Sequence, residues 1–232
     1  MNPPLSIVIP CLNEAAGIAA ALARLQPLRK RGVEVVVVDG GSSDDTLRLA
    51  TPLADRAIVA TRGRAAQMNA GAAIARGSVL LFLHADCTLP ASADQLIIDG
   101  LANGARRWGR FDVAFDAKPP LMRAVAYLMN RRSRLTGIAT GDQGIFVTRG
   151  LFVAHNGFPD IALMEDVALS RRLRIGSPPL CLPDRITASA RRWEKHGIWR
   201  TVVLMWRLRF AYFTGADPAE LALRYDGARP RN

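Results

Sequence analysis

The sequence predicts an α/β fold, a mostly parallel mixed sheet flanked by helices. Three observations indicate it. In the first half of the chain, short apolar runs rich in β-branched residues alternate with helical stretches at the spacing of βαβ units. Several of these runs end in a carboxylate, at the position where open α/β sheets bind ligands. Hydrophobic residues make up 50% of the 232 residues, which is enough for a sizeable core.

The first half of the chain is expected to hold four strands, at residues 5–10, 33–38, 57–60 and 78–83. Asn13 can cap a helix that runs to about residue 24, and Ser42 or Ser43 can cap the next one. An alanine-rich helix at 65–75 ends before Gly77. Because strand–helix–strand crossovers are right-handed, these units build a parallel sheet.

In the second half of the chain, helices and strands no longer alternate regularly. Helices are expected at 92–101, from 119 onward, at 163–174 and at 198–213, and strands at 110–115, 144–148, 180–182 and 186–190. No linker composition separates the halves. We therefore expect one domain over residues 1–232, in which 1–90 binds a nucleotide and 91–232, with amphipathic C-terminal helices, binds an acceptor.

The net charge of +11 favours anionic partners such as phosphates, anionic lipid or nucleic acid, although a basic surface alone would explain it. The three cysteines form no C-x-x-C pair, which argues against a disulfide framework or a cysteine metal site. The first residues lack the charged and apolar regions of a signal peptide. Apolar runs fall short of the ~18 residues of a membrane span. We expect a cytoplasmic protein.

Two acids of the first half follow expected strands. Asp39 ends a run of four valines, where it can accept a hydrogen bond from a base or a ribose hydroxyl; alternatively, it closes the turn Asp-Gly-Gly-Ser. Glu14 follows the first strand, and its alternative role is that of a first-turn helix acid. The turn at 10–14 has neither the dinucleotide fingerprint nor a P-loop. A nucleotide would therefore be held in another way.

Asp86 follows the strand at 78–83. A hard cation such as Mg²⁺ or Mn²⁺ needs only one or two carboxylates besides waters and substrate phosphates. His84 lies on the same side of an extended chain, but a lone histidine is more often structural. Arg64 precedes a helix whose N-terminal amides face the same edge, which suits a phosphate. The alternative for Arg64 is a solvated loop side chain.

The second half adds a candidate base and a cationic segment. Asp166, beside Glu165 at the start of an expected helix, suits a general base acting on a hydroxyl; first-turn acids also stabilise a helix without any catalytic role. The segment 191–197, R-R-W-E-K-H-G, can close over a diphosphate or can simply begin the last helix.

In order and spacing, these strings resemble the GT-A glycosyltransferases of the large inverting family 2. The matching strings are I-V-I-P-C-L-N-E, V-V-V-V-D-G-G-S-S-D-D-T, the carboxylate after L-L-F-L, and M-E-D-V-A-L-S-R-R-L-R. The resemblance implies a GT-A (Rossmann-like) fold, a nucleotide-sugar donor (a UDP-sugar by default), Mn²⁺ or Mg²⁺, a hydroxyl acceptor, and single displacement with inversion. H-A-D and R-R-W-E-K-H-G are also similar to a small bacterial subgroup associated with arsenosugar biosynthesis.

The resemblance implies roles for individual residues. Asp166 matches the usual candidate base, and Asp86 matches the last acid of the D-x-D motif, whose first acid is replaced here by His84. His196 matches a C-terminal metal-binding histidine, which would join Asp86 at the metal. The residues expected to hold the donor are Pro10, Glu14, Asp39, Arg64, Asp86, Gly141, Asp142, Gln143, Arg192 and Trp193.

Two other functions stay open. A nucleotidyltransferase on a related sheet would need a glycine-rich triphosphate loop, and a basic binding module explains the charge but not the ordered acids. We expect no nucleic-acid partner. The aromatic and arginine-rich helix at 198–213 is expected to pack on the core or in a homodimer. Its alternative is contact with an anionic membrane surface, which would make the protein peripheral on the inner face of the membrane.

Overall fold

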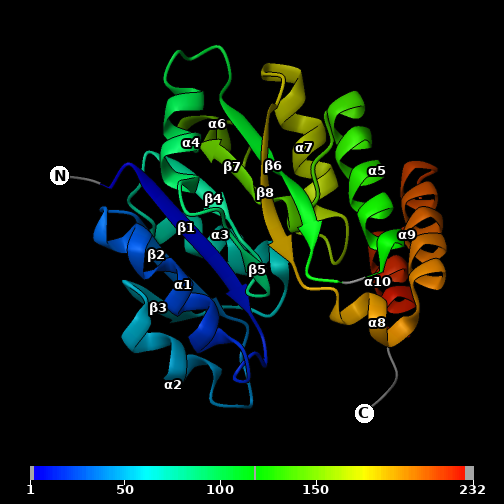
Figure 1. Cartoon of the computed structure of the whole chain (residues 1–232), viewed down its shortest axis with the longest axis horizontal. Coiled ribbons are helices and arrows are strands. Elements are labelled where there is room, and N and C mark those ends of the chain that lie inside the picture. The colour runs from blue at the N-terminus through cyan, green and yellow to red at the C-terminus, as the bar shows by residue number, and fades with distance from the viewer. Residues whose placement is uncertain (1–2, 118, 228–232) are drawn as a thin grey trace.

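A computed structural model describes residues 3–117 and 119–227, apart from the side chains of Arg192 and Asp226. An eight-stranded sheet runs through the molecule, and helices cover both of its faces (Figure 1). The strands are β1 (Leu5–Cys11), β2 (Glu34–Asp39), β3 (Arg56–Val59), β4 (Val79–Phe82), β5 (Cys87–Thr88), β6 (Trp108–Phe115), β7 (Ile145–Thr148) and β8 (Leu180–Ala188). The predicted α/β fold is confirmed.

The strand order is β3-β2-β1-β4-β7-β6-β8-β5. The first four strands are parallel, β7 is antiparallel to both neighbours, β8 is parallel to β6, and β5 is antiparallel to β8. Because β7 runs against β4, the segment that precedes β7 lies at the edge where β4 ends. That edge therefore collects the ends of β1, β2 and β4 together with the loop before Ile145.

Ten α-helices are seen in the described part of the chain. They are α1 (Ile18–Lys30), α2 (Thr46–Ala50), α3 (Arg64–Ile74), α4 (Ala93–Leu101), α5 (Pro120–Thr136), α6 (Arg149–Ala154), α7 (Glu165–Gly176), α8 (Arg191–His196), α9 (Ile198–Phe213) and α10 (Pro218–Gly227). Alternate residues of β1 face opposite sides of the sheet. Ile7 packs with Leu22 of α1 in one core cluster, and Val8 packs with Met68 of α3 in another.

The first helix differs from its expected range of 13–24. Asn13 adopts a left-handed φ of 53°, and its side-chain oxygen accepts a hydrogen bond from the Ser43 N–H at 2.9 Å. Asn13 thus joins two neighbouring turns, and α1 begins only at Ile18. The helix also continues through Pro27 to Lys30, and the Gln26 side chain donates a hydrogen bond to the Leu22 carbonyl oxygen at 2.9 Å.

In the second half, the two strands expected at 180–182 and 186–190 are one strand, β8. Its pairing with β6 shifts between Phe111 and Asp112, so that Pro183 and Asp184 are accommodated as an irregularity. Five short elements were not expected. They are β5, which pairs through Cys87 and Thr88 with the end of β8, the helices α6 and α10, and the 3-10 helices at Thr51–Leu53 and Gly141–Gln143.

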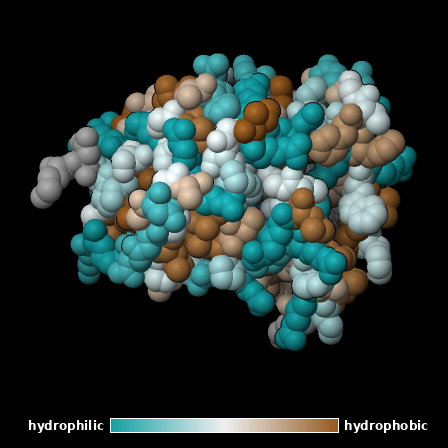
Figure 2. Space-filling model, turned by 90° about the horizontal axis from the view of Figure 1, so that it is seen from above, coloured by the Kyte–Doolittle hydropathy of each residue, from teal (hydrophilic) through white to brown (hydrophobic). Residues whose placement is uncertain are grey.

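The last long helix, α9, is only partly packed. Thr201 and Leu208 are its buried residues, and it shares a cluster with Leu163, Met164 and Val167 around the start of α7. Its outer face exposes large apolar side chains: Trp199, Val203, Trp206, Phe210 and Phe213. Hydrophobic residues reach the surface at the end of the molecule that carries α5 and α9 (Figure 2). This face of α9 is therefore not packed on the core, and its contact with a second copy or with a membrane stays a prediction.

Among the described residues, no helix combines the length and hydrophobicity needed to cross a membrane.

Candidate functional site

Asp39 ends β2 with only 2% of its surface exposed. One carboxylate oxygen accepts a hydrogen bond from the Ser42 backbone N–H at 2.9 Å, and the other accepts one from the Ser42 hydroxyl. Asp39 is thus at the expected edge of the sheet, where it closes its own turn. Its contact with a base or a ribose stays a prediction.

Glu14 lies in the turn after β1, and its N–H donates to the Thr46 hydroxyl at 2.8 Å. Burial raises the pKa of the Glu14 carboxyl; Arg191 opposes that rise and the charge of Asp86 adds to it. Nη2 of Arg191, at the start of α8, lies 3.9 Å from Glu14 Oε2. The segment after β8 therefore reaches the ends of the first strands, as the sequence analysis allowed.

Gln67 of α3 holds the ends of β1 and β2 together. Its side-chain nitrogen donates to the carbonyl oxygens of Cys11 and Val38, each at 2.8 Å, and the residue is 3% exposed. The sequence carried no signal for this role, because a glutamine within an alanine-rich helix is ordinarily a surface residue.

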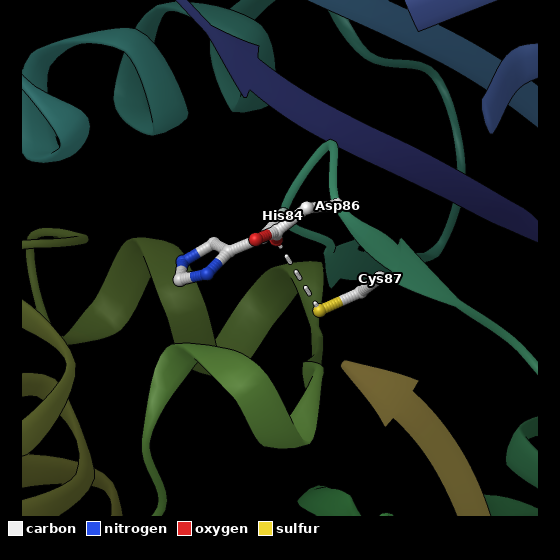
Figure 3. A group of neighbouring side chains, drawn as sticks. All are labelled: His84, Asp86 and Cys87. Carbon is white, nitrogen blue, oxygen red and sulfur yellow. Dashed lines mark hydrogen bonds between the residues drawn. The ribbon is translucent and has the colours of Figure 1, made fainter. Parts of the chain in front are cut away.

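His84, Asp86 and Cys87 follow β4 and gather around one point (Figure 3). One ligand-type atom of each lies within 4.8 Å of the others, and Asp86 is exposed. Burial raises the pKa of the Cys87 thiol well above its ordinary value, and Asp142 and Asp86 add to the rise. A neutral thiol does not suit Mn²⁺ or Mg²⁺, whereas an exposed carboxylate does. Asp86 is the residue of this group that fits the predicted cation.

His84 is linked to the loop before β7. Its Nδ1 lies 3.3 Å from Asp142 Oδ1. Burial alone would lower the pKa of His84, but the hydrogen bond and charge of Asp142 outweigh it and raise that pKa above its ordinary value. A Cβ added to Gly141 would lie 2.3 Å from His84 Nε2, so only glycine permits this approach. Gly141 and Asp142 are thus placed beside the end of β4.

Asp166 lies in the first turn of α7 and is joined to the same loop. Its Oδ2 accepts a hydrogen bond from the Gly141 N–H at 2.8 Å, and its Oδ1 accepts one from the Val167 N–H at 2.7 Å. Met164, the N-cap residue of α7, has a left-handed φ of 70°, a conformation that costs a methionine of the order of 1 kcal/mol and that clusters at functional sites. The loop therefore brings Asp166 beside the His84–Asp86 segment.

Glu165, the first residue of α7, pairs with Arg64. Arg64 Nε lies 3.0 Å from Glu165 Oε1, and Glu165 is 2% exposed. Burial raises the pKa of Glu165, Arg64 opposes the rise, and Asp166 adds to it. Glu165 Oε2 is buried without a hydrogen-bond partner among the described residues, and a cavity of about 10 Å³ next to it, also lined by His84 and Asp166, has room for about one water. The ion pair fixes Arg64 at the start of α3.

Several other predicted site residues are buried in the interior of the protein. Pro10 is buried within β1, beside Val38 of β2. Gln143 is fully buried and accepts a hydrogen bond from the Thr140 N–H at 3.2 Å. Trp193 is 9% exposed and packs edge-on against Phe115, with ring centroids 5.5 Å apart. None of these side chains is presented at the strand ends, so their donor contacts stay predictions.

Two further predicted residues lie in α8. Arg192 has a side chain that lies outside the described residues. His196 is half-buried at the end of α8, and the group of ligand-type atoms around Asp86 does not include it in the described part of the chain. Metal binding by His196 stays a prediction.

The sequence of this chain is similar to those of known glycosyltransferases. A family model described as Glycosyl transferase family 2 matches residues 6–153, a range that contains Asp39, Asp86 and the Gly141 loop. A PGL/p-HBAD biosynthesis glycosyltransferase of Mycobacterium tuberculosis is 40% identical over 94 residues, which are 38% of this chain and 37% of that protein. The succinoglycan biosynthesis protein ExoA of Rhizobium meliloti is 39% identical over 109 residues, 43% and 33% of the two chains.

The same curated relatives include an undecaprenyl-phosphate 4-deoxy-4-formamido-L-arabinose transferase of Pseudomonas paraeruginosa, which is 30% identical over 60% of this chain and 44% of its own. The chain thus spans less than half the length of each relative named here. None of these names refers to arsenosugars.

Solved structures share the fold. A mannosyltransferase of Pyrobaculum calidifontis, in complex with GDP-Man and Mn²⁺, aligns with 91% of this chain and 61% of its own at a TM-score of 0.64 and 23% identity. S. aureus TarS, in complex with UDP-GlcNAc, aligns with 80% of this chain and 58% of its own at a TM-score of 0.65 and 17% identity.

Proposed function

Because the chain belongs to glycosyl transferase family 2, we propose that it transfers a sugar from a nucleoside diphosphate to a hydroxyl group by one displacement, with inversion at the anomeric carbon. The Gly141 loop carries this proposal. It contacts His84, two residues before Asp86, and its N–H holds the carboxylate of Asp166. A donor at Asp86 and an acceptor at Asp166 would therefore meet across one short segment.

The donor side needs positive charge, because the departing diphosphate gains negative charge as the glycosyl bond breaks. Asp86 would hold Mn²⁺ or Mg²⁺, and that cation would supply Lewis-acid neutralisation of the diphosphate. Arg64, fixed by Glu165 at the start of α3, adds a cation beside the N-terminal amides of that helix. These groups favour a diphosphate that arrives over the strand ends.

The acceptor side needs a base. Both oxygens of Asp166 accept backbone N–H groups, which fixes the carboxylate in one orientation. In that orientation it would take the proton from the acceptor hydroxyl as the oxygen attacks the anomeric carbon. A positioned base of this kind contributes about 10²–10⁴-fold to a rate.

The identity of the donor, the subgroup and the contact with a membrane are proposed from one observation each. The solved relatives were seen with UDP-GlcNAc and with GDP-Man, so a UDP-sugar is the first donor to test and a GDP-sugar the second. Membership of the arsenosugar-associated subgroup is supported by the H-A-D and R-R-W-E-K-H-G strings. Peripheral contact with an anionic membrane on the cytoplasmic side is supported by the exposed aromatic face of α9.

The test is incubation of the protein with a panel of sugar nucleotides and Mn²⁺, with a mixture of hydroxyl acceptors. Release of nucleoside diphosphate is the expected result. Release of pyrophosphate would instead identify a nucleotidyltransferase, and release of neither product would favour a non-enzymatic binding module.

A further inference from the structure

Arg132 of α5 and Arg209 of α9 lie on the faces through which these two helices pack against each other. Val125 and Met129 of α5 share a cluster with Ile198 and Val202 of α9. Positions seven apart lie on the same face of a helix. Arg132, seven residues after Val125, and Arg209, seven residues after Val202, are therefore both placed where the two helices face each other. Exposed neighbours such as Arg131 and Arg207 lie on other faces.

The guanidinium group of Arg132 has unsatisfied hydrogen-bond donors at this position. Its Nε and Nη2 are buried and have no hydrogen-bond partner among the described residues. Burial, together with the charges of Arg209 and Arg110, lowers the pKa of Arg132 to about 10. A buried guanidinium without a partner is costly, and an anion that reaches it would offset that cost.

The other charges around the pair show where an anion would bind. Burial lowers the pKa of Arg209, whereas Asp166 and Asp142 raise it; Asp166 acts on Arg132 in the same direction. Both oxygens of Asp166 are already used by backbone amides. Arg110 is engaged by Asp112, Ser133 and the Asn130 carbonyl. Arg132 and Arg209 thus remain as cations whose charges interact with that of the candidate base.

We propose that Arg132 and Arg209 form a subsite for an acidic group, a phosphate or a carboxylate, carried by the acceptor. This inference rests on the proposed function. The charge of Asp166 acts on both Arg132 of α5 and Arg209 of α9, whereas Arg64, the cation on the donor side, is paired with Glu165 at the start of α3. Planar guanidinium groups can bind such an anion through two parallel N–H donors, which would turn the acceptor hydroxyl toward Asp166.

The experiment titrates inorganic phosphate into the protein by calorimetry, at fixed ionic strength and with saturating UDP and Mn²⁺. Arg132→Met and Arg209→Met should each weaken phosphate binding by about tenfold or more. The matched controls Arg131→Met and Arg207→Met remove the same charge from exposed positions of α5 and α9 and should change the affinity by less than about twofold. Equal losses in all four variants, or no loss in the first two, would overturn the subsite.

Other readouts separate the competing explanations. If Arg132→Met or Arg209→Met weakens UDP–Mn²⁺ binding, the pair belongs to the donor and the inference is wrong. Should Arg132→Met fail to fold, Arg209→Met and Arg209→Lys test the same subsite, and partial recovery by lysine supports an ionic role. Pair-dependent phosphate binding supports the subsite even if no sugar transfer is found, in which case the proposed function fails alone.

A second arm identifies the source of the phosphate. Phosphatidylcholine vesicles with and without a long-chain alkyl phosphate are offered in place of inorganic phosphate. Capture of only the phosphate-bearing vesicles, lost in Arg132→Met and Arg209→Met, supports the subsite and assigns the anion to a lipid head group. Capture that is unchanged in these variants contradicts a role for the pair in lipid binding, and a soluble acceptor is then the source that the phosphate titration supports.

Discussion

At the scale of single residues, Asp86 is the carboxylate whose removal separates metal binding from folding. It is exposed and buries little apolar surface, so Asp86→Ala should leave the thermal unfolding temperature unchanged. Calorimetric titration with UDP or GDP should show that Mn²⁺ no longer strengthens nucleotide binding. Asp99→Ala, which removes an exposed acid from α4, is the control. A variant that binds nucleotide and Mn²⁺ as tightly as the parent would contradict the assignment.

Asp166 is tested by a change that keeps its shape. Asp166→Asn retains an oxygen that can accept the Gly141 N–H but removes the basic charge. Transfer should fall by about 10²-fold or more while donor binding is nearly unchanged, as measured by kcat and by nucleotide titration. Parental transfer to a hydroxyl acceptor would show that Asp166 only starts a helix.

Glu165 gives the comparison for that experiment. Because it holds Arg64 and does not share the position of Asp166, Glu165→Gln should affect transfer less and act mainly through the donor affinity. The opposite ranking, with Glu165→Gln the more damaging change in kcat, would exchange the roles of the two acids.

The positions of Asp39 and Asp86 at the edge of the sheet were predictable, because each acid ends or follows an apolar run that forms a strand. The contacts within the site were not, since they join distant segments: Asp142 reaches His84, and Gly141 reaches Asp166. Gln67 and Arg132 gave no signal at all, because glutamine and arginine in helices are ordinarily solvated. The packing of α3 on β1 buries Gln67, and Nε and Nη2 of Arg132 are buried although the residue lies in a helix.

At the scale of elements, a buried carboxylate fixes the start of β2 against β1. Glu34 accepts hydrogen bonds from the Ser6 hydroxyl at 2.5 Å and the Arg76 N–H at 2.7 Å. Burial alone would raise the pKa of Glu34, but these bonds lower it below its ordinary 4.5. Glu34→Gln should therefore lower the free energy of unfolding by about 1–3 kcal/mol at pH 7, measured in urea.

The pH dependence of that difference has a definite sign. A carboxyl whose pKa is lower in the folded state stabilises the protein above its unfolded pKa, and this contribution is lost as the pH falls through the folded value. The gap between parent and Glu34→Gln should shrink below about pH 4.5. Glu220→Gln on the exposed face of α10 should show no such gap. A gap that stays constant down to acid unfolding would contradict the ionic explanation.

The outer face of α9 is tested by removing two of its aromatic rings. Trp206 and Phe210 are 71% and 72% exposed, so replacing both by Ser should change the free energy of unfolding by less than about 0.5 kcal/mol each. Binding to vesicles of anionic lipid should fall sharply in a flotation assay. Leu208→Ser, at a buried position, should instead destabilise the fold. Loss of a dimer with unchanged vesicle binding would show that the face packs on a second copy.

Long apolar elements were predictable, and short ones were not. The strands β1, β2 and β4 are continuous runs of buried residues with flanking turns. The strand β5 has only Cys87 and Thr88, which carry no periodicity. Pro183 made β8 look like two strands, although its irregular pairing with β6 lets one strand continue. α9 was expected to be covered because it is apolar on most sides, yet no other described element covers its outer face.

At the scale of the whole molecule, the order of the parallel strands β1 to β4 could be predicted from the sequence, whereas the arrangement of the other strands could not. Right-handed crossovers place β1, β2, β3 and β4 side by side. The insertion of β7 between β4 and β6 depends on contacts between distant segments, such as Phe82 with Ile145. That antiparallel insertion brings the Gly141 loop to the end of β4. No local sequence pattern predicts this part of the site.

The pairing of β5 with β8 has a consequence for the order of folding. Asp86 directly precedes β5, and Cys87 pairs with Ala188, 101 residues later in the sequence. Contacts between residues so far apart in sequence pay a large loop-closure entropy and form late. During refolding from urea, recovery of Mn²⁺-dependent nucleotide binding should lag behind the far-ultraviolet circular dichroism signal. Simultaneous recovery would mean that the end of β4 reaches its place before β8 joins the sheet. If recovery does lag, a ribosome-bound chain from which β8 has not yet emerged is expected to hold the helices that precede β8 but not to bind the metal.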